Sequence, residues 1–172
     1  PIGTGLFLTA YKVDLVSGAD FAPVGDSMAE LNAAAAAAAR ETGISACTDI
    51  TGFGLLGHGY ELAAASGVEL HIYADAVPVF DGAAHLARQG LVPAGTYRNR
   101  DHLVGKVTLP PDLAQEQSDL LFDPQTSGGL LLSVPAGRSR SLVEALARRG
   151  IEAAAIGEVA VAQAGKPRLV VL

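Results

Sequence analysis

The stretch TDITGFGLLGHG, residues 48–59, decides how this chain folds. An apolar segment precedes it and a helix-like pattern follows it, so a strand is expected to pass into a helix here. Glycine weakens a helix by about 1 kcal/mol relative to alanine. Nevertheless Gly52 and Gly54 stand where the helix begins, directly after Asp49. These residues therefore call for a reason other than helix formation.

Asp49 and the glycines fit one half of a magnesium–nucleotide site. Ligands of α/β sheets tend to lie at the carboxyl ends of strands, where Asp49 is expected. A helix start offers free N–H groups to phosphate, and glycine lets the backbone approach a ligand closely. A carboxylate suits Mg2+, which prefers oxygen ligands and often bridges to substrate phosphates. The stretch lacks the Gly-Lys-Ser/Thr ending of a P-loop. The alternative is that Asp49 caps the helix and the glycines allow tight packing.

A second candidate lies in DPQTSGGLLLSV, residues 123–134. Asp123-Pro124 is typical of the start of a turn, and three polar residues then precede Gly128 and Gly129. Hydroxyls and exposed N–H groups in such a loop can hold an anion. An ordinary loop that leads into a buried strand explains the same composition.

A third candidate lies in LVPAGTYRNRDH, residues 91–102. Arg98 and Arg100 could bind phosphate, because guanidinium groups match its geometry. Surface arginines are common, however, so a simple solvated surface is the favoured explanation.

The sequence does not favour a transition-metal site or a catalytic thiol. His58 and Glu61 lie three residues apart on the expected helix, but a transition metal usually needs three or four protein ligands. We expect His58 to pair with a nearby acid or carbonyl instead. Cys47 is expected to be a buried structural thiol, because no basic residue adjoins it to lower its pKa.

Helical and strand patterns alternate along the chain. The predicted elements are an apolar strand in 5–13, a helix over 25–43 capped by Asp26 or Ser27, a strand in 44–50, a helix over 53–66, a strand in 68–74, a helix in 79–90, a loop over 91–106, a helix in 110–122, a strand in 129–135, a helix in 138–150 and a hairpin over 153–172. The antiparallel hairpin breaks a purely parallel scheme. The pattern therefore predicts an α+β fold, with mixed-sheet α/β layers, in one domain over residues 1–172.

Composition limits the classes of function. Hydrophobic residues make up 49% and charged residues 17% of the 172, which is enough for a sizeable core. The net charge of -6 argues against nucleic-acid binding, which needs a basic surface. No apolar run suggests a membrane span, and no signal peptide is evident, so a soluble protein is expected. The single cysteine cannot form an intrachain disulfide and fits a reducing compartment such as the cytoplasm.

Several of these segments resemble one enzyme family. TDITGFGLLGH, GLVPAGTYRN and LLFDPQTSGGLLLSV are similar to the carboxyl-terminal half of selenophosphate synthetase, also called selenide, water dikinase. The opening PIGTGLFLTA resembles the start of that half, and the resemblance runs in order over essentially the whole chain. Aminoimidazole ribonucleotide synthetase and the hydrogenase-maturation dehydratase share the fold but not the GFGLLGH run.

The resemblance implies a fold like the carboxyl-terminal domain of aminoimidazole ribonucleotide synthetase. It also implies an enzyme that makes selenophosphate from selenide, ATP and water, with release of AMP and phosphate. By motif, Asp49 would be a ligand of Mg2+. The residues that would line the ATP cleft are Thr48, Gly52, Phe53 and Gly54 on one side and Thr126, Ser127, Gly128 and Gly129 on the other.

In that family the reactive cysteine or selenocysteine, a lysine and most magnesium-binding aspartates lie on an amino-terminal domain, which also forms a homodimer. The present sequence begins at Pro1 without that domain, and Cys47 does not match its reactive residue. We therefore expect the ATP-covering half of the enzyme, inactive by itself, with its own amino-terminal domain, ATP and selenide as partners. Two alternatives stay open: a domain of another ATP-dependent member of the superfamily, and a stand-alone nucleotide-binding or scaffolding module.

Overall fold

The computed structural model describes every residue from Pro1 to Leu172. Its helices are α1 (Thr4–Lys12), α2 (Gly18–Ala29), α3 (Ala33–Thr42), α4 (Gly54–Ser66), α5 (Ala83–Arg88), α6 (Ala94–His102), α7 (Gln115–Phe122) and α8 (Ser139–Ala147). Its strands are β1 (Ala46–Asp49), β2 (Val68–Ile72), β3 (Val107–Thr108), β4 (Leu130–Ser133), β5 (Gly157–Val161) and β6 (Leu169–Val171). Short 3-10 turns cover Ala74–Ala76 and Ala136–Arg138.

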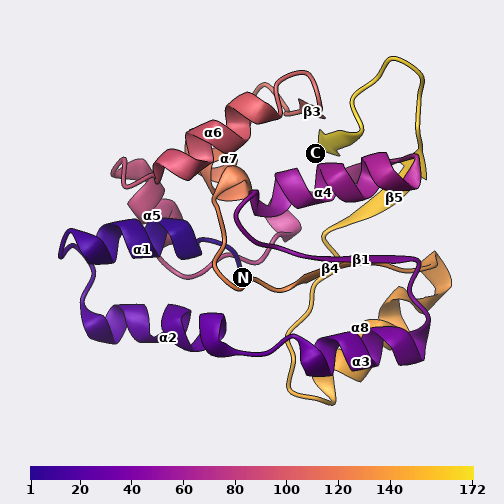
Figure 1. Cartoon of the computed structure of the whole chain (residues 1–172), viewed down its shortest axis with the longest axis horizontal. Coiled ribbons are helices and arrows are strands. Elements are labelled where there is room, and N and C mark those ends of the chain that lie inside the picture. Colours follow the sequence, from indigo (N-terminus) through magenta and orange to yellow (C-terminus); the bar gives the residue numbers. More distant parts are fainter.

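The strands form two separate sheets (Figure 1). One is an antiparallel ribbon of β1 and β4, in which Asp49 faces Leu130. The other has four strands in the order β3-β6-β2-β5. In it β2, β6 and β3 run parallel, while β5 runs antiparallel to β2. This mixed arrangement confirms the predicted α+β class.

Helix α4 packs against both sheets. It contacts β2 and β6 of the four-stranded sheet and β1 of the ribbon. Gly59 permits this close packing, because a Cβ atom there would lie 3.0 Å from Leu169 and 3.8 Å from both Leu131 and Leu70. The glycines within the helix, which lower its intrinsic stability, thus let two layers meet on it.

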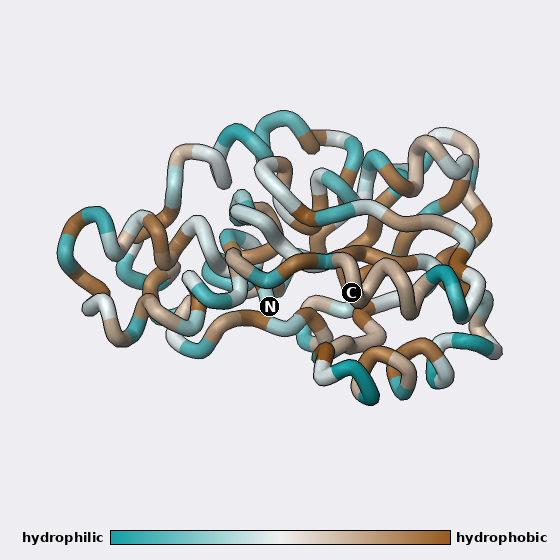
Figure 2. Tube along the Cα trace, turned by 60° about the horizontal axis from the view of Figure 1, so that its bottom comes forward, coloured by the Kyte–Doolittle hydropathy of each residue, from teal (hydrophilic) through white to brown (hydrophobic).

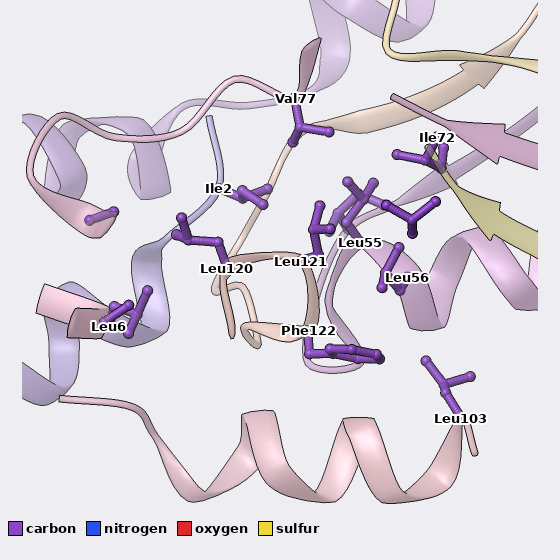
Figure 3. Close-up of a cluster of buried hydrophobic side chains, with 14 of the residues drawn as sticks. Ile2, Leu6, Leu55, Leu56, Ile72, Val77, Leu103, Leu120, Leu121 and Phe122 are labelled. Carbon is purple, nitrogen blue, oxygen red and sulfur yellow. The ribbon is translucent and has the colours of Figure 1, made fainter. Parts of the chain in front are cut away.

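The main core lies around α4 and the end of α7. It comprises 21 buried hydrophobic residues. Figure 3 shows Leu120, Leu121 and Phe122 pointing from the end of α7 toward Ile2, Leu55 and Leu103. Five consecutive α7 residues, 118–122, are buried. The end of α7 therefore brings together the chain start, α4 and α6.

A second, smaller cluster packs α3 and α8 on the ribbon. Ala38 of α3 meets Leu142 and Leu146 of α8, with Leu132 of β4 packed against them. The alanine run of α3 lets α8 approach closely, and Ala38 and Ala39 are fully buried. Val13 and Leu15, in the connection between α1 and α2, are exposed apolar residues. Figure 2 shows brown, hydrophobic stretches of the trace at its left end.

Many sequence predictions are confirmed. β1, α4, β2, α5, α7, β4 and α8 all lie within the ranges predicted for them. Gly67 ends α4 in the left-handed conformation, with φ 68°.

The strand predicted in 5–13 is wrong, because this segment forms α1. Its apolar run is too short for periodicity to separate a strand from a buried helix. Leu6, Phe7 and Ala10 are buried at helical spacing, so tertiary packing selects the helix.

The single helix predicted over 25–43 is also wrong. α2 begins earlier, with the Ser17 hydroxyl accepting a hydrogen bond from the Asp20 amide, and neither Asp26 nor Ser27 is a cap. The backbone becomes extended at Glu30. Asn32 then donates to the Gly128 carbonyl at 2.9 Å, which holds the break in place.

Two further predictions fail. The loop expected over 91–106 contains α6, whose low apolar content hides it from periodicity. The carboxyl-terminal hairpin does not form, because β5 and β6 pair with opposite edges of β2 rather than with each other.

None of the helices has both the length and the apolar character needed to cross a bilayer.

We predict that Leu56→Ala lowers the free energy of unfolding by about 2–5 kcal/mol, because it leaves a cavity under α4. Leu56 is fully buried. The matched control Leu31→Ala, at a side chain that is 81% exposed, should change it by less than about 0.5 kcal/mol. Urea titration of both variants is the measurement, and equal losses would contradict the packing described.

Candidate functional site

The two glycine-rich segments predicted as candidates lie side by side. Beyond the β1–β4 ribbon, the Ile50 amide donates to the Gly129 carbonyl at 2.9 Å and the Gly128 amide to the Ile50 carbonyl at 3.1 Å. The Gln125 amide donates to the Thr51 carbonyl at 3.0 Å. The loop after α7 and the turn before α4 therefore form one continuous hydrogen-bonded surface.

Asp49 stands at the end of β1 on this surface. Asp49 is exposed and takes part in none of the ion pairs of the chain. Helix α4 has Phe53 as its N-cap, with no hydrogen bond from a side chain. The alternative that Asp49 caps this helix is therefore wrong, and its carboxylate is free to bind a group from outside the chain.

Two of the glycines are required by the fold. Gly54 has φ +69°, and a Cβ atom there would lie 2.9 Å from the carbonyl oxygens of both Phe122 and Asp123. At Gly128 a Cβ atom would collide with the carbonyl oxygen of Ile50. These positions bring the two segments into backbone contact, so packing alone explains the glycines.

The other two glycines have no such explanation. At Gly52 and Gly129 a Cβ atom would meet nothing within 4 Å, and neither residue needs a positive φ. The absence of a side chain therefore leaves open backbone on the outer side of each segment. That is what close approach of an external group to the main chain requires.

The remaining predicted residues differ in their exposure. Phe53 is 54% exposed, and its ring centroid lies 5.5 Å from that of His58. Thr126 and Ser127 are exposed, and Ser127 has φ 49°, which is uncommon for a residue with a side chain. Thr48 is half-buried, and its hydroxyl donates to the Asp49 carbonyl at 3.2 Å.

A buried polar cluster anchors this surface to the start of α1. The Asp123 carboxylate accepts from the Gly5 amide at 2.9 Å, and so stands at the positive end of the helix. The Gln125 side-chain oxygen accepts from the Gly3 amide at 3.1 Å and the Thr4 amide at 3.2 Å. We did not predict this function for either residue, although the Asp-Pro-Gln sequence marks the turn.

Burial raises the pKa of Asp123 to about 7, although hydrogen bonds from Gln125 and the Gly5 amide act in the opposite direction. One carboxyl oxygen, Oδ1, is buried without a hydrogen-bond partner. Desolvation penalises the charged form, so the group holds a proton more readily than an exposed aspartate does.

Asn99 is a further residue whose structural role the sequence does not predict. Its side-chain nitrogen donates to the carbonyls of Gly52 and Phe122, both at 3.0 Å. It therefore links the turn before α4 to the end of α7. No apolar periodicity marks α6, and the burial of Thr96 and Asn99 on one side of the helix is visible only in the structure.

The third candidate, residues 91–102, contains two arginines that differ in their surroundings. Arg100 forms an ion pair with Asp119 at 2.5 Å and lies over the Phe122 ring, so it is a structural residue. Arg98 is exposed. The expectation that both arginines could bind phosphate is therefore wrong for Arg100.

His58 pairs as expected. Its Nε2 lies 3.0 Å from the Thr51 hydroxyl, and its Nδ1 lies 3.7 Å from Glu61. The chain contains no group of three or more histidine, cysteine or acidic side chains that could hold a metal ion. Any metal at Asp49 would need further ligands from elsewhere.

Cys47 is exposed, so the prediction of a buried thiol is wrong. The two-stranded ribbon leaves this position uncovered, on the same face as Asp49. Partial burial and then the charge of Asp49 raise the pKa of the Cys47 thiol above its usual value. Little thiolate is therefore present at neutral pH, and the thiol remains unsuited to nucleophilic chemistry.

The site is an open surface. The hollow beside Phe53, between α4 and α6, has a volume of about 10 Å³, which is the space of a single water molecule. This hollow is too small for a nucleotide, and Asp49 is not among the residues that line it.

Residues 2–170 match the family described as AIR synthase related protein, C-terminal domain. The chain belongs to this family. The family and the fold class predicted from the motifs are thereby confirmed.

Two relatives share the name selenide, water dikinase. Selenide, water dikinase of Geobacter metallireducens is 46% identical over 159 residues, which cover 92% of this chain and 46% of the relative. Selenide, water dikinase of Caldanaerobacter subterraneus subsp. tengcongensis is 44% identical over 149 residues, which cover 87% of this chain and 43% of the relative. The AIR synthase related domain thus spans a little less than half the length of these relatives.

A crystal structure of thiamine-monophosphate kinase from Stenotrophomonas maltophilia K279a has the same fold. The likeness has a TM-score of 0.64 and 16% sequence identity, and it covers 99% of this chain and 47% of that one. At this identity the likeness concerns the fold of the AIR synthase related domain alone.

We predict that Gly54→Ala lowers the free energy of unfolding by about 1–3 kcal/mol or more, because an alanine must adopt a strained φ against two carbonyl oxygens. Gly52→Ala, two residues away and in open space, should change it by less than about 1 kcal/mol. Chemical denaturation of the two variants is the measurement. A stable Gly54→Ala protein would show that the close contact is absent.

We predict that stability depends on pH through Asp123. Because its folded-state pKa is raised to about 7, its contribution is fully present below about pH 4 and is lost as pH rises toward 7. The loss is on the order of a few kcal/mol. Asp123→Asn should remove this contribution to the pH dependence of the free energy of unfolding. Asp112→Asn, at an exposed position, should keep it. Urea unfolding at pH 4 to 8 is the measurement, and identical slopes for both variants would contradict it.

Proposed function

We propose that this chain is the domain that covers the ATP site of a selenide, water dikinase. The complete enzyme would make selenophosphate from selenide, ATP and water, and release AMP and phosphate. One observation carries the proposal: a free carboxylate, Asp49, adjoins two stretches of open backbone, at Gly52 and Gly129. The name shared by relatives at 44% and 46% identity supplies the substrates.

Asp49 would be a ligand of Mg2+. Its carboxylate is exposed and makes no ion pair, and it offers the hard oxygen that Mg2+ prefers. Mg2+ often uses one or two carboxylates together with substrate phosphates, so a single aspartate fits a share of its coordination. Bound there, the ion would neutralise part of the phosphate charge of ATP.

The two segments beside Asp49 would contact the phosphate chain. Gly52 and Gly129 leave the backbone open, and the hydroxyls of Thr126 and Ser127 are exposed hydrogen-bond donors. Thr48, Phe53, Gly54 and Gly128 complete the predicted wall, with Gly54 and Gly128 acting through the fit of the two segments. On this surface the phosphate chain of ATP would be bound through hydrogen bonds to its oxygens rather than through lysine or arginine side chains.

Other parts of the enzyme would supply the remaining machinery. Phosphoryl transfer depends on several positive and metal groups that converge on the phosphates, and this surface offers one carboxylate. An amino-terminal domain would carry the reactive cysteine or selenocysteine, a lysine and further magnesium ligands, and would form a homodimer. Cys47, whose pKa is raised, does not suit the reactive position. A free thiol is also compatible with the cytoplasm as the proposed compartment.

The complete protein should form AMP from ATP and Mg2+ only when selenide is present. Anaerobic assay with chromatography of the nucleotides, and phosphorus NMR of the products, is the measurement. AMP formation with another acceptor but not with selenide would assign the domain to a different ATP-using enzyme. ATP binding without any turnover would assign it to a nucleotide-binding module.

In the same assay, Asp49→Asn should lower kcat by about 100-fold or more, because a neutral amide is a weaker ligand for a hard cation. The melting temperature should not change, since Asp49 caps no helix. Asp112→Asn, at an exposed position on another part of the chain, is the control. Turnover near the wild-type value would show that Asp49 is not a magnesium ligand.

A further inference from the structure

The Gln125 side chain uses its hydrogen-bonding capacity inside the protein. It is 4% exposed. Its oxygen accepts from the Gly3 amide, from the Thr4 amide and from the Thr4 hydroxyl, at 3.1 to 3.2 Å. Its nitrogen donates to the carbonyl oxygen and to the carboxylate of Asp123, both at 2.8 Å. Gln125 therefore has no group left for a ligand.

The contacts of Gln125 meet where three segments join. The Gln125 side chain accepts a hydrogen bond from the Thr4 amide at the start of α1. Its backbone amide donates to the Thr51 carbonyl in the turn before α4. The next amide, that of Thr126, donates to the Thr4 hydroxyl at 3.0 Å. The exposed segment from Thr126 to Gly129 thus leaves the core from a point that Gln125 fixes.

We propose that Gln125 is a positioning residue, which fixes the segment Thr126–Gly129 beside Asp49 so that both can contact the same ligand. The proposal rests on the function proposed above. Gln125 acts through this segment and touches no substrate.

Only an amide of this length fits the site. The oxygen must accept from three donors, while the nitrogen must donate to two acceptors on Asp123. A glutamate keeps the acceptor but loses the donor, and it places a second carboxylate against Asp123. An apolar side chain would leave every partner unpaired in the interior, at a cost for each group. Pro124 favours an extended conformation of the preceding residue, and Asp123 has φ -61° and ψ 126°. In this conformation the Asp123 carboxylate accepts from the side-chain nitrogen of Gln125.

Gln125→Glu in the complete protein tests the proposal. The amides of Thr126 and Gly128 should exchange hydrogen at least about 10-fold faster, while those of β2 keep their protection. The KM for ATP should rise about 10-fold or more, by a larger factor than kcat falls. Gln117→Glu is the matched control, since Gln117 donates to Asp75 at the surface. A uniform rise in exchange over the whole domain would overturn the proposal, because it would reveal a general loss of stability.

Thr4→Val decides the matter if Gln125→Glu does not fold. It removes the one hydroxyl that links Gln125 to the Thr126 amide, at a residue that is 3% exposed. Faster exchange at Gly128, whose amide donates to the Ile50 carbonyl, with β2 unchanged, supports the proposal, and unchanged exchange at Gly128 overturns it. If the wild-type protein forms no AMP with selenide, the proposed function fails, whereas the exchange measurements still decide whether Gln125 positions the segment.

Discussion

Buried hydrogen bonds of Gln125 and Asp123 with the start of α1 tie distant segments of the chain together. Polar groups in an interior cost free energy unless they are paired, and here nearly every one is paired. The first amides of α1 gain acceptors that the helix itself cannot provide. The same residues follow directly on α7, so these hydrogen bonds join the start of α1 to the end of α7.

Backbone contacts extend this constraint to the site. Gly54 brings α4 against the carbonyls of Phe122 and Asp123, and Asn99 joins α6 to the same region. The backbone amide of Gln125 also donates to the Thr51 carbonyl in the turn before α4. The inner side of each glycine-rich segment is thus committed to packing. The outer side, with Asp49 and the exposed residues after Gln125, is left for an external group.

Local sequence patterns revealed most elements but misassigned those that depend on distant partners. β1 and α4 were predicted because an apolar strand and an amphipathic helix each have their own period. The apolar run of α1 is too short to reveal a helix, and the helix is selected by packing and by contacts such as that of Gly5 with Asp123, more than a hundred positions away. The sequence of α6 predicts a loop, because the helix is held by contacts of Asn99 and Arg100 with distant residues: Gly52, Phe122 and Asp119. Pairing of β5 and β6 with β2 is likewise a long-range choice.

The sequence by itself determined the fold class, the family and the two segments that form the candidate surface, because strand, turn and motif signals are local. It did not separate Gly54 and Gly128, which packing requires, from Gly52 and Gly129, which packing does not require. Nor did it reveal that Cys47 is exposed, that Arg100 is paired, or that Gln125 is fully bonded within the core. Only the tertiary structure decided these points, because the space and the hydrogen-bond partners around a residue are supplied by segments far away in the chain.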